Sequence, residues 1–266
     1  MVIDTFLFNG EEDLLEFRLL ELNDYVDKFV IIECEVDFQN KPKEIFWDIM
    51  KHRFDKYKNK IEHIIIESPF EKNEIIDYHG SYALQVHVRQ EGVRRTKKVD
   101  DDIIIHGDLD EIWDVNKFPE IKEAVIKNGV VNLEVEWYVW DFEHRIKNKT
   151  SSHPYVSLGK YLNRDDTYSY RAPNKHFTVK KSAWHLSWFG GIESIKKKAN
   201  GGMGSDYYRA KKQNKNLNAL SETLDRYKKR RLPLSLSSSA NRLEIEFVPI
   251  SKNKKLPKNF RFFENL

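Results

Sequence analysis

The stretch Asp101–Ile112, which reads Asp-Asp-Ile-Ile-Ile-His-Gly-Asp-Leu-Asp-Glu-Ile, is the segment from which the fold and the chemistry of this chain are interpreted. Its three consecutive β-branched residues, Ile103–Ile105, are typical of a strand that is buried on both faces. Gly107 then permits a turn or the close approach of a ligand to the backbone. Asp108 and Asp110 follow at the carboxyl end of this strand, where open α/β sheets bind their ligands.

Two carboxylates separated by one residue can share a hard divalent cation, and that cation can hold a diphosphate. The pattern therefore predicts a metal and diphosphate site at Asp108 and Asp110. The pair alone is a weak signal, because the chain has 42 acidic residues and a solvated turn explains most such pairs. The buried strand before the pair and the return to apolar residues in Glu111-Ile112-Trp113 favour the metal site.

The overall composition excludes several classes of function. The 266 residues include 45 basic and 42 acidic side chains, a formal net charge of +3, so we expect no nucleic-acid partner. The one cysteine, Cys34, cannot form a disulfide within the chain, and its apolar neighbours predict a buried, inert thiol. A single cysteine is compatible with a reducing compartment. The first residues have no basic leader, and no run approaches the ~20 apolar residues of a membrane span, so we expect a cytoplasmic protein.

Strand and helix patterns alternate in the first half of the chain, which predicts a mostly parallel central sheet flanked by helices. Asn9 is expected to cap the first helix, with Glu12 as its capping-box partner. We expect one domain over residues 1–266, with a nucleotide-binding half at about 1–115 and an irregular, β-rich acceptor half at about 116–266. The expected strands are 2–8, 29–34, 60–67, 103–108, 130–142, 175–188 and 243–248; the expected helices are 10–25, a short one within 42–57, 81–98, one from 118, 192–198 and 217–227; and loops are expected at 150–167 and 200–204.

Two residues of the first half could contact a nucleotide. Glu33 ends the second expected strand, where a ribose or a base could bind, although a carboxylate that simply reaches solvent explains the position equally well. Arg89 could pair with phosphate oxygens, and a surface salt bridge is the alternative.

The segment Trp184–Gly191, Trp-His-Leu-Ser-Trp-Phe-Gly-Gly, is the second unusual stretch. Trp184 and Trp188 could stack on sugar rings, and His185 could be a metal ligand or a base near neutral pH. A core histidine with a backbone partner is the alternative. The basic runs 196–198 and 228–231 are interpreted as solvated faces, or as sites of peripheral contact with an anionic membrane.

Short motifs spread over nearly the whole chain also share one pattern. They are Asp4–Asn9, Glu12–Leu22, Val26–Glu33, Lys41–Lys43, Arg89, Asp102–Ile112, Ala183–Ser187 and Leu256–Pro257. In this order they resemble glycosyltransferase family 17, the family of the β-1,4-mannosyl-glycoprotein β-1,4-N-acetylglucosaminyltransferase. The resemblance implies a GT-A-type, Rossmann-like fold, UDP-GlcNAc as donor, a glycan acceptor, inversion at the anomeric carbon, and Asp108 and Asp110 at a site for Mn²⁺ or Mg²⁺.

One departure from the family pattern concerns the segment after the tryptophan–histidine motif. The family usually carries a lysine and then a serine–histidine pair there. In this chain Lys196–Lys198 are followed by residues 200–204, Asn-Gly-Gly-Met-Gly, without a histidine. We also expect no signal anchor of the kind that Golgi members of the family carry. This suggests a bacterial or viral enzyme that acts on a cytosolic acceptor.

The sequence therefore predicts a metal-dependent inverting glycosyltransferase. The donor is expected to contact Glu33, Arg89, Gly107 and Asp108, and the acceptor to contact Trp184 and Trp188. His185 is the expected base, with Glu111 next and Glu193 as a weaker candidate. The first alternative is a phosphatase or phosphotransferase with Asp108 as nucleophile and Asp110 as acid, against which Glu111 argues. The second is a non-catalytic sugar-binding module, which the absent histidine leaves open.

Overall fold

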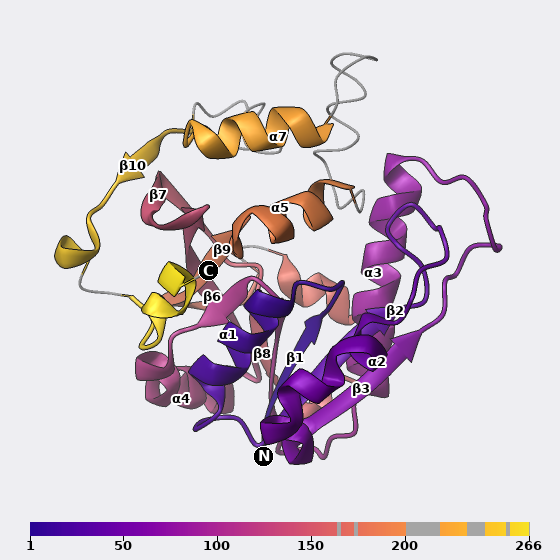
Figure 1. Cartoon of the computed structure of the whole chain (residues 1–266). Helices are drawn as coiled ribbons and strands as arrows, with labels where there is room; N and C mark the ends of the chain where they lie inside the picture. The colour runs from indigo at the N-terminus through magenta and orange to yellow at the C-terminus, as the bar shows by residue number, and fades with distance from the viewer. Residues whose placement is uncertain (164–165, 173–174, 201–218, 233–242, 254–255, 266) are drawn as a thin grey trace.

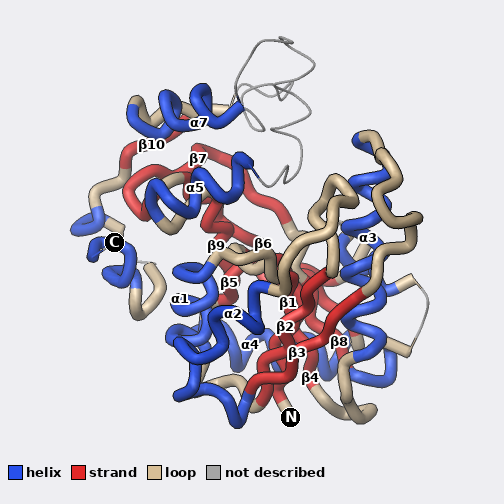
Figure 2. The backbone as a smooth tube through the Cα atoms, turned by 45° about the vertical axis from the view of Figure 1, so that its right-hand side comes forward, coloured by secondary structure: helices blue, strands red, loops and turns tan. Residues whose placement is uncertain are grey.

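The protein forms one curled sheet of ten described strands with helices packed on both faces (Figures 1 and 2). The computed structural model describes residues 1–266 except 164–165, 173–174, 201–218, 233–242, 254–255 and 266. The strands are β1 (Val2–Leu7), β2 (Lys28–Cys34), β3 (Ile61–Ile66), β4 (Ile103–Asp108), β5 (Glu111–Trp113), β6 (Val130–Val139), β7 (Asp141–Ser151), β8 (Tyr155–Leu158), β9 (Phe177–Ser187) and β10 (Ile245–Phe247). The α-helices are α1 (Glu12–Leu22), α2 (Phe46–Met50), α3 (Tyr78–Arg95), α4 (Phe118–Asn128), α5 (Gly191–Asn200) and α7 (Ala219–Lys228), and the 3₁₀ helices are η1 (Lys51–Lys60), η2 (Val115–Lys117), η3 (Gly159–Tyr161), η4 (Thr167–Arg171), η5 (Ile250–Lys252) and η6 (Phe260–Asn265).

The strands of the first half form a parallel block in the order β4-β1-β2-β3. In this block β1 lies beside β4, with Leu7 opposite Asp108. The carboxyl ends of these strands point toward the side of the molecule on which α5 lies (Figure 1). The α/β fold class predicted from the sequence is therefore confirmed, and the block of four parallel strands is formed by the first half.

The second half extends the same sheet with mostly antiparallel pairs, in the order β10-β7-β6-β8-β4. Strand β9 leaves this order, because it pairs parallel with β6 and antiparallel with β5. The short strand β5 is thereby tied to the later part of the chain. The two halves expected from the sequence share one continuous sheet.

The apolar run of β4 is explained by its two buried faces. Ile103 and Ile105 belong to the larger core cluster, which also contains side chains of α1 and α4. Ile104 belongs to the second cluster, which it shares with Leu84 and Val88 of α3. Figure 2 shows α1, α2 and α4 on one side of the parallel strands and α3 on the other. A strand between two helical layers needs apolar side chains at consecutive positions, as this one has.

Helix α3 packs closely on β2 because Gly92 presents no side chain to it. A Cβ atom at Gly92 would lie 2.5 Å from Cδ1 and from Cγ2 of Ile32. The helix begins after Asp77, whose side chain accepts a hydrogen bond from the Gly80 N–H. These contacts fix the position of α3, which carries Arg89.

Two predictions about the second half were wrong. The expected single strand at 130–142 is two strands, β6 and β7, and Trp140 between them has a φ of 73°. The expected loop at 150–167 includes the end of β7, the buried strand β8 and the helix η3. Strand β8 is only four residues long, and serines and a proline precede it, so the composition gives little indication of a strand.

The predicted cap of the first helix was also wrong. Residue Glu11, not Asn9, precedes α1, and the Glu11 side chain makes no capping hydrogen bond to this helix. The Asn9 N–H instead donates to the Glu11 carboxylate at 3.0 Å. The loop expected at 200–204 lies, beyond Asn200, outside the described residues. Within the described segments, no helix is long and apolar enough to cross a membrane.

Candidate active site

The four residues Asp108–Glu111 form a carboxylate turn that connects the end of β4 to the start of β5. The Glu111 carboxylate folds back and accepts the Asp108 N–H at 2.8 Å through Oε2. The Leu186 N–H donates to the Asp110 carbonyl at 2.7 Å, and Glu111 lies opposite His185 in the β5–β9 pair. The turn is thus closed by its own glutamate and fixed by β9.

The buried guanidinium of Arg18 donates hydrogen bonds to the backbone of the carboxylate turn. Arg18 of α1 donates through Nη1 to the carbonyl oxygens of Asp108, Leu109 and Glu111 at 3.0, 3.2 and 2.9 Å. Its Nε and Nη2 donate to the two carboxylate oxygens of Asp4 at 2.6 and 2.8 Å. Both side chains of this pair are 0% exposed. Because β1 supplies Asp4 and α1 supplies Arg18, the first two elements of the chain determine the shape of the turn.

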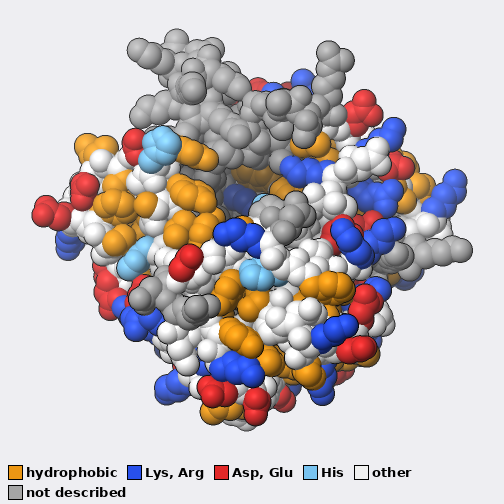
Figure 3. Space-filling model, turned by 180° about the vertical axis from the view of Figure 1, so that it is seen from behind, with side chains coloured by type: hydrophobic (Ala, Val, Ile, Leu, Met, Phe, Trp, Pro, Cys, Tyr) orange, Lys and Arg blue, Asp and Glu red, His pale blue; other side chains and the backbone are white. Residues whose placement is uncertain are grey.

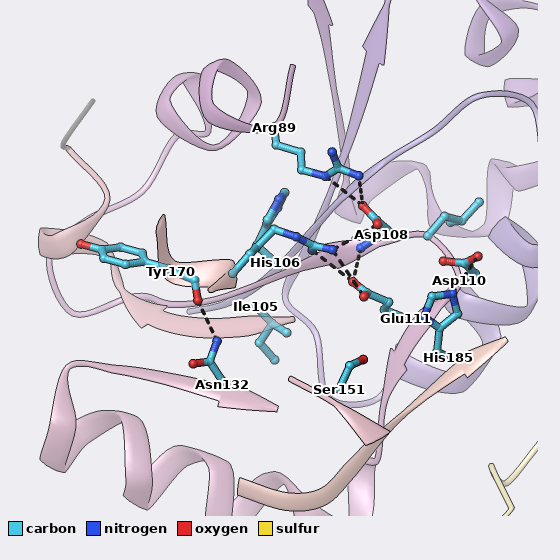
Figure 4. Close-up of polar contacts among 12 residues, drawn as sticks. Arg89, Ile105, His106, Asp108, Asp110, Glu111, Asn132, Ser151, Tyr170 and His185 are labelled. Carbon is cyan, nitrogen blue, oxygen red and sulfur yellow. Dashed lines mark hydrogen bonds and ion pairs between the residues drawn. The ribbon is translucent and has the colours of Figure 1, made fainter. Parts of the chain in front are cut away.

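The Asp108 carboxylate is held by two arginines, and Figure 4 shows one of them, Arg89, beside it. Arg89 of α3 donates to Oδ1 through Nε at 3.0 Å and Nη2 at 2.8 Å, and Arg171 of η4 donates to Oδ2 at 3.1 Å. Arg171 also pairs with Glu111 at 3.1 Å. Burial acts to raise the pKa of Asp108, but the charges of Arg171 and Arg89 hold that pKa well below its usual range. Burial acts to lower the pKa of Arg171, and Asp108 and Glu111 outweigh it, so the group is ionised.

The Asp110 carboxylate has a different set of cationic neighbours. Lys198 Nζ of α5 lies 3.2 Å from Oδ2, and His185 Nε2 of β9 lies 3.5 Å from the same oxygen. Burial acts to raise the pKa of Asp110, and Lys198 and His185 bring it below the usual value. Conversely, burial acts to lower the pKa of His185, and Asp110 raises it. The imidazole also stacks on Trp137, with ring centroids 3.9 Å apart.

The two carboxylates suit a divalent cation to different degrees. Both are ionised, and carboxylate oxygens are the ligands that Mg²⁺ and Mn²⁺ prefer. Asp108 has both oxygens engaged by arginines, whereas Oδ1 of Asp110 accepts no hydrogen bond from the described residues. The described residues contain no group of three or more His, Cys, Asp or Glu side chains placed to hold a metal ion. Asp110 is therefore the better first ligand for such an ion.

Other residues predicted from the sequence have contacts elsewhere. Glu33 is buried and accepts hydrogen bonds from Lys43 Nζ at 2.7 Å and from the N–H groups of Phe46 and Trp47 at 2.7 and 3.2 Å. It thus holds the start of α2. Glu193 is 77% exposed and pairs with Lys196 on α5.

Gly107 and the two tryptophans have mainly packing contacts. A Cβ at Gly107 would lie 3.1 Å from Oε2 of Glu111, so the glycine leaves room for that carboxylate. Trp184 and Trp188 are 3% and 4% exposed and belong to the larger core cluster. Lys198 Nζ lies 5.4 Å from the Trp188 ring centroid, so Trp188 lies beside the Asp110 ion pair. The acceptor contacts predicted for these tryptophans stay predictions.

The structure thus brings together Asp108, Asp110, Glu111, Arg89 and His185, which the sequence had singled out. Sequence reasoning missed Arg171 and Arg18 as parts of the site and interpreted Lys198 as part of a solvated run. Arg18 stands in one of the motifs that carry the family resemblance, which was the available signal. Arg171 lies 60 residues from Glu111 in a polar segment without a recognisable pattern.

The comparison with protein families agrees with the resemblance. The profile of glycosyltransferase family 17 matches residues 1–219, a range that includes every residue of the site described above. No curated protein matches the chain. The crystal structure of S. aureus TarS 1-349 is similar to 90% of this chain and 75% of its own, at 10% identity and a TM-score of 0.41. A second crystal structure of S. aureus TarS is similar over 90% of this chain and 46% of its own, at 11% identity and a TM-score of 0.42.

Proposed function

Because the chain belongs to glycosyltransferase family 17, and is thus a glycosyltransferase, we propose that it transfers a sugar from a nucleotide-sugar donor to a glycan at the carboxylate turn. One observation carries the proposal. Two ionised carboxylates lie at the carboxyl end of β4, and Arg89, Arg171 and Lys198 surround them. Open α/β sheets bind nucleotides at this edge, and cationic groups there can stabilise a departing diphosphate. UDP-GlcNAc as donor, inversion and the GT-A type belong to the proposal through the family resemblance.

The proposal includes Mn²⁺ or Mg²⁺, with Asp110 and Asp108 as the carboxylates that would hold it. When bound, such an ion supplies positive charge to the diphosphate leaving group. Lys198 shares Oδ2 of Asp110, so an ion on that oxygen competes with the ammonium group. Oδ1 of Asp110 takes no part in this ion pair and is the oxygen proposed for the ion.

His185 is the proposed base for the acceptor hydroxyl. Asp110 raises the pKa of His185, although burial acts in the opposite direction, so the imidazole is a stronger base than in water. Glu111 is less suited to this role, because Oε2 already accepts the Asp108 N–H and Arg171 Nη1, and Oε1 accepts Arg171 Nη2 at 3.4 Å. The same reasoning disfavours Asp108 as the nucleophile of a phosphatase, since arginines engage both of its oxygens.

The direct test follows UDP release from UDP-GlcNAc and other UDP-sugars, with Mn²⁺ and a panel of glycan acceptors. We expect Asp110→Asn to lower UDP release by about 100-fold, the size seen when one charged or hydrogen-bonding group is removed from a transition-state site. Asp101→Asn is the matched control, because Asp101 lies just before β4 and is exposed. Absence of UDP release from every sugar nucleotide tested, or equal rates for Asp110→Asn and the wild type, would contradict the proposal.

A further inference from the structure

Helix α3 carries a stripe of side chains that runs outward from the carboxylate turn. Its members stand four, three and four residues apart, a spacing that puts them on one face of the helix: Tyr78, Tyr82, Gln85 and Arg89. Because Arg89 donates to Asp108, this face points toward that carboxylate. At about 1.5 Å per residue, Tyr82 lies roughly 10 Å and Tyr78 roughly 16 Å beyond Arg89 along the helix axis. Figure 1 shows α3 rising past the arrowheads of the parallel strands, on the side where α5 lies.

Helix η4 adds a third tyrosine to this stripe. The hydroxyl of Tyr168 lies 2.8 Å from that of Tyr82, and the two rings meet edge to face with their centroids 6.1 Å apart. Tyr168 precedes Arg171 by three residues, so one short helix carries both the tyrosine and an arginine of the site. Burial and the Tyr82 hydroxyl raise the pKa of Tyr168 to about 12, against the charges of the two arginines that hold Asp108. The tyrosines of α3 and η4 thus adjoin the candidate site.

The tyrosines of α3 expose ring surface that the tryptophans predicted for the acceptor do not. Tyr78 and Tyr82 are 47% and 48% exposed, whereas Trp184 and Trp188 are almost completely buried. The view from behind the molecule (Figure 3) shows a hollow in that face, with hydrophobic side chains, a class that includes tyrosine, gathered on the side where α3 lies. Aromatic surface that a ligand could cover is therefore present on α3.

The position of the tyrosines suits an acceptor better than a donor. They lie where α3 of the first half meets η4, and η4 is tied to β6, because Asn132 Nδ2 donates to the Tyr170 carbonyl at 2.7 Å. In the sheet, β8 and β6 lie on the side of β4 away from β1 and β2. The nucleotide of a donor is expected at the carboxyl ends of the parallel block. A ligand on the tyrosines approaches the carboxylate turn from the other half of the molecule.

The chemistry of the tyrosines suits a sugar. A tyrosine ring offers an apolar face and a polar hydroxyl. A pyranose ring likewise has a face of C–H groups and a rim of hydroxyl groups, so the two can stack and exchange hydrogen bonds at their edges. Tyr78 and Tyr82, one helical turn apart, present two such rings in succession.

We propose that Tyr78, Tyr82 and Tyr168, the tyrosine wall, bind sugar rings of the glycan acceptor that lie beyond the reacting sugar. Since Tyr82 lies roughly 10 Å beyond Arg89, the wall favours an oligosaccharide over a single sugar. The role of this glycan as the acceptor rests on the proposed function. The binding of an oligosaccharide to the wall does not.

Saturation-transfer NMR of the full chain tests the wall, with mannotriose, chitotriose, maltotriose and their monosaccharides as probes. The wild type is expected to bind at least one trisaccharide, and to bind it more tightly than the monosaccharide. Tyr82→Ala should weaken this binding by about two- to tenfold, the equivalent of one aromatic contact, and leave the calorimetric affinity for UDP unchanged. Phe247→Ala is the matched control, because Phe247 is an exposed aromatic residue on β10, at the far edge of the sheet from β3.

Tyr82→Phe separates the ring from its hydroxyl. It keeps the stacking surface and loses the contact with the Tyr168 hydroxyl, so it should bind the trisaccharide more tightly than Tyr82→Ala. Alanine is a good helix former at an exposed position of α3, and circular dichroism confirms that both variants are folded.

The inference is overturned if the wild type binds none of the trisaccharides, if folded Tyr82→Ala binds them as tightly as the wild type, or if Tyr82→Phe binds as weakly as Tyr82→Ala. A loss of UDP affinity in Tyr82→Ala with unchanged trisaccharide binding would assign the wall to the nucleotide instead, and also overturns it. These outcomes are separate from a failure of sugar transfer, because trisaccharide binding is measured without a donor and without UDP release.

Discussion

Replacing Arg18 by leucine is expected to destabilise the protein strongly, because this arginine joins the first strand and helix to the carboxylate turn. The side chain is 0% exposed and donates two hydrogen bonds to Asp4 and three to carbonyl oxygens of the turn. Removing one partner of such a buried pair leaves the Asp4 charge without compensation, which costs about 3–5 kcal/mol. For a chain of this size that corresponds to a fall in melting temperature of roughly 6–20 °C.

Thermal and urea unfolding followed by circular dichroism measure this effect. The double variant Asp4→Leu/Arg18→Leu removes the buried charge as well, so it should be more stable than Arg18→Leu alone. Arg94→Leu serves as the surface control and should change stability by only about 0.5 kcal/mol. The reasoning is refuted if Arg18→Leu melts within about 2 °C of the wild type, or if adding Asp4→Leu lowers stability further.

Three further predictions concern the stability and reactivity of buried groups. Burial acts to raise the pKa of Glu33, but the nearby His63 imidazole and the hydrogen bond from Lys43 lower it. The contribution of Glu33 to stability is therefore present above the ordinary carboxyl value of about 4.3 and is lost as pH falls below that. In urea titrations at pH 7, Glu33→Gln should therefore have a lower free energy of unfolding than the wild type. This difference should narrow below about pH 4.3, and a constant difference down to pH 3 contradicts the prediction. Cys34 is 5% exposed and burial raises its pKa, so a disulfide reagent should label it only after unfolding, and rapid labelling of native protein would refute its burial. Gly92→Ala should cost about 1–3 kcal/mol, because its Cβ would meet Ile32 at 2.5 Å, and an unchanged melting temperature would show that β2 and α3 can separate at no cost.

The sequence predicts the elements whose signals are local. The run Ile103–Ile105 indicates a strand buried on both faces, and the structure places that strand between the two core clusters. The proline at position 119 indicates the start of a helix, and α4 begins at Phe118. Asp108 and Asp110 are predicted to lie together because they share one short turn. In each case a few neighbouring residues carry the information.

The contacts that complete the site depend on residues far apart in the chain. Arg171 reaches Asp108 across 63 positions, and Lys198 reaches Asp110 across 88. Neither arginine nor lysine has a local pattern that distinguishes a buried ion pair from a solvated charge. Strand β7 was missed beyond Phe142 for a related reason, since Arg145, Lys147 and Lys149 alternate on its partly exposed face and resemble a polar loop.

The pairing of β5 with β9 has a consequence for the order in which the protein can become active during its synthesis. The backbone partner of Asp110 is Leu186, and the ammonium partner is Lys198, so a nascent chain that ends before these residues contains the turn without its supports. Strand β1 is separated from its neighbour β4 by about 100 residues along the chain. Strand pairs with so large a sequence separation form slowly, because a long loop must close first. The carboxylate turn therefore gains these contacts only after β9 and α5 have been synthesised, and truncated chains that stop before β9 should lack them.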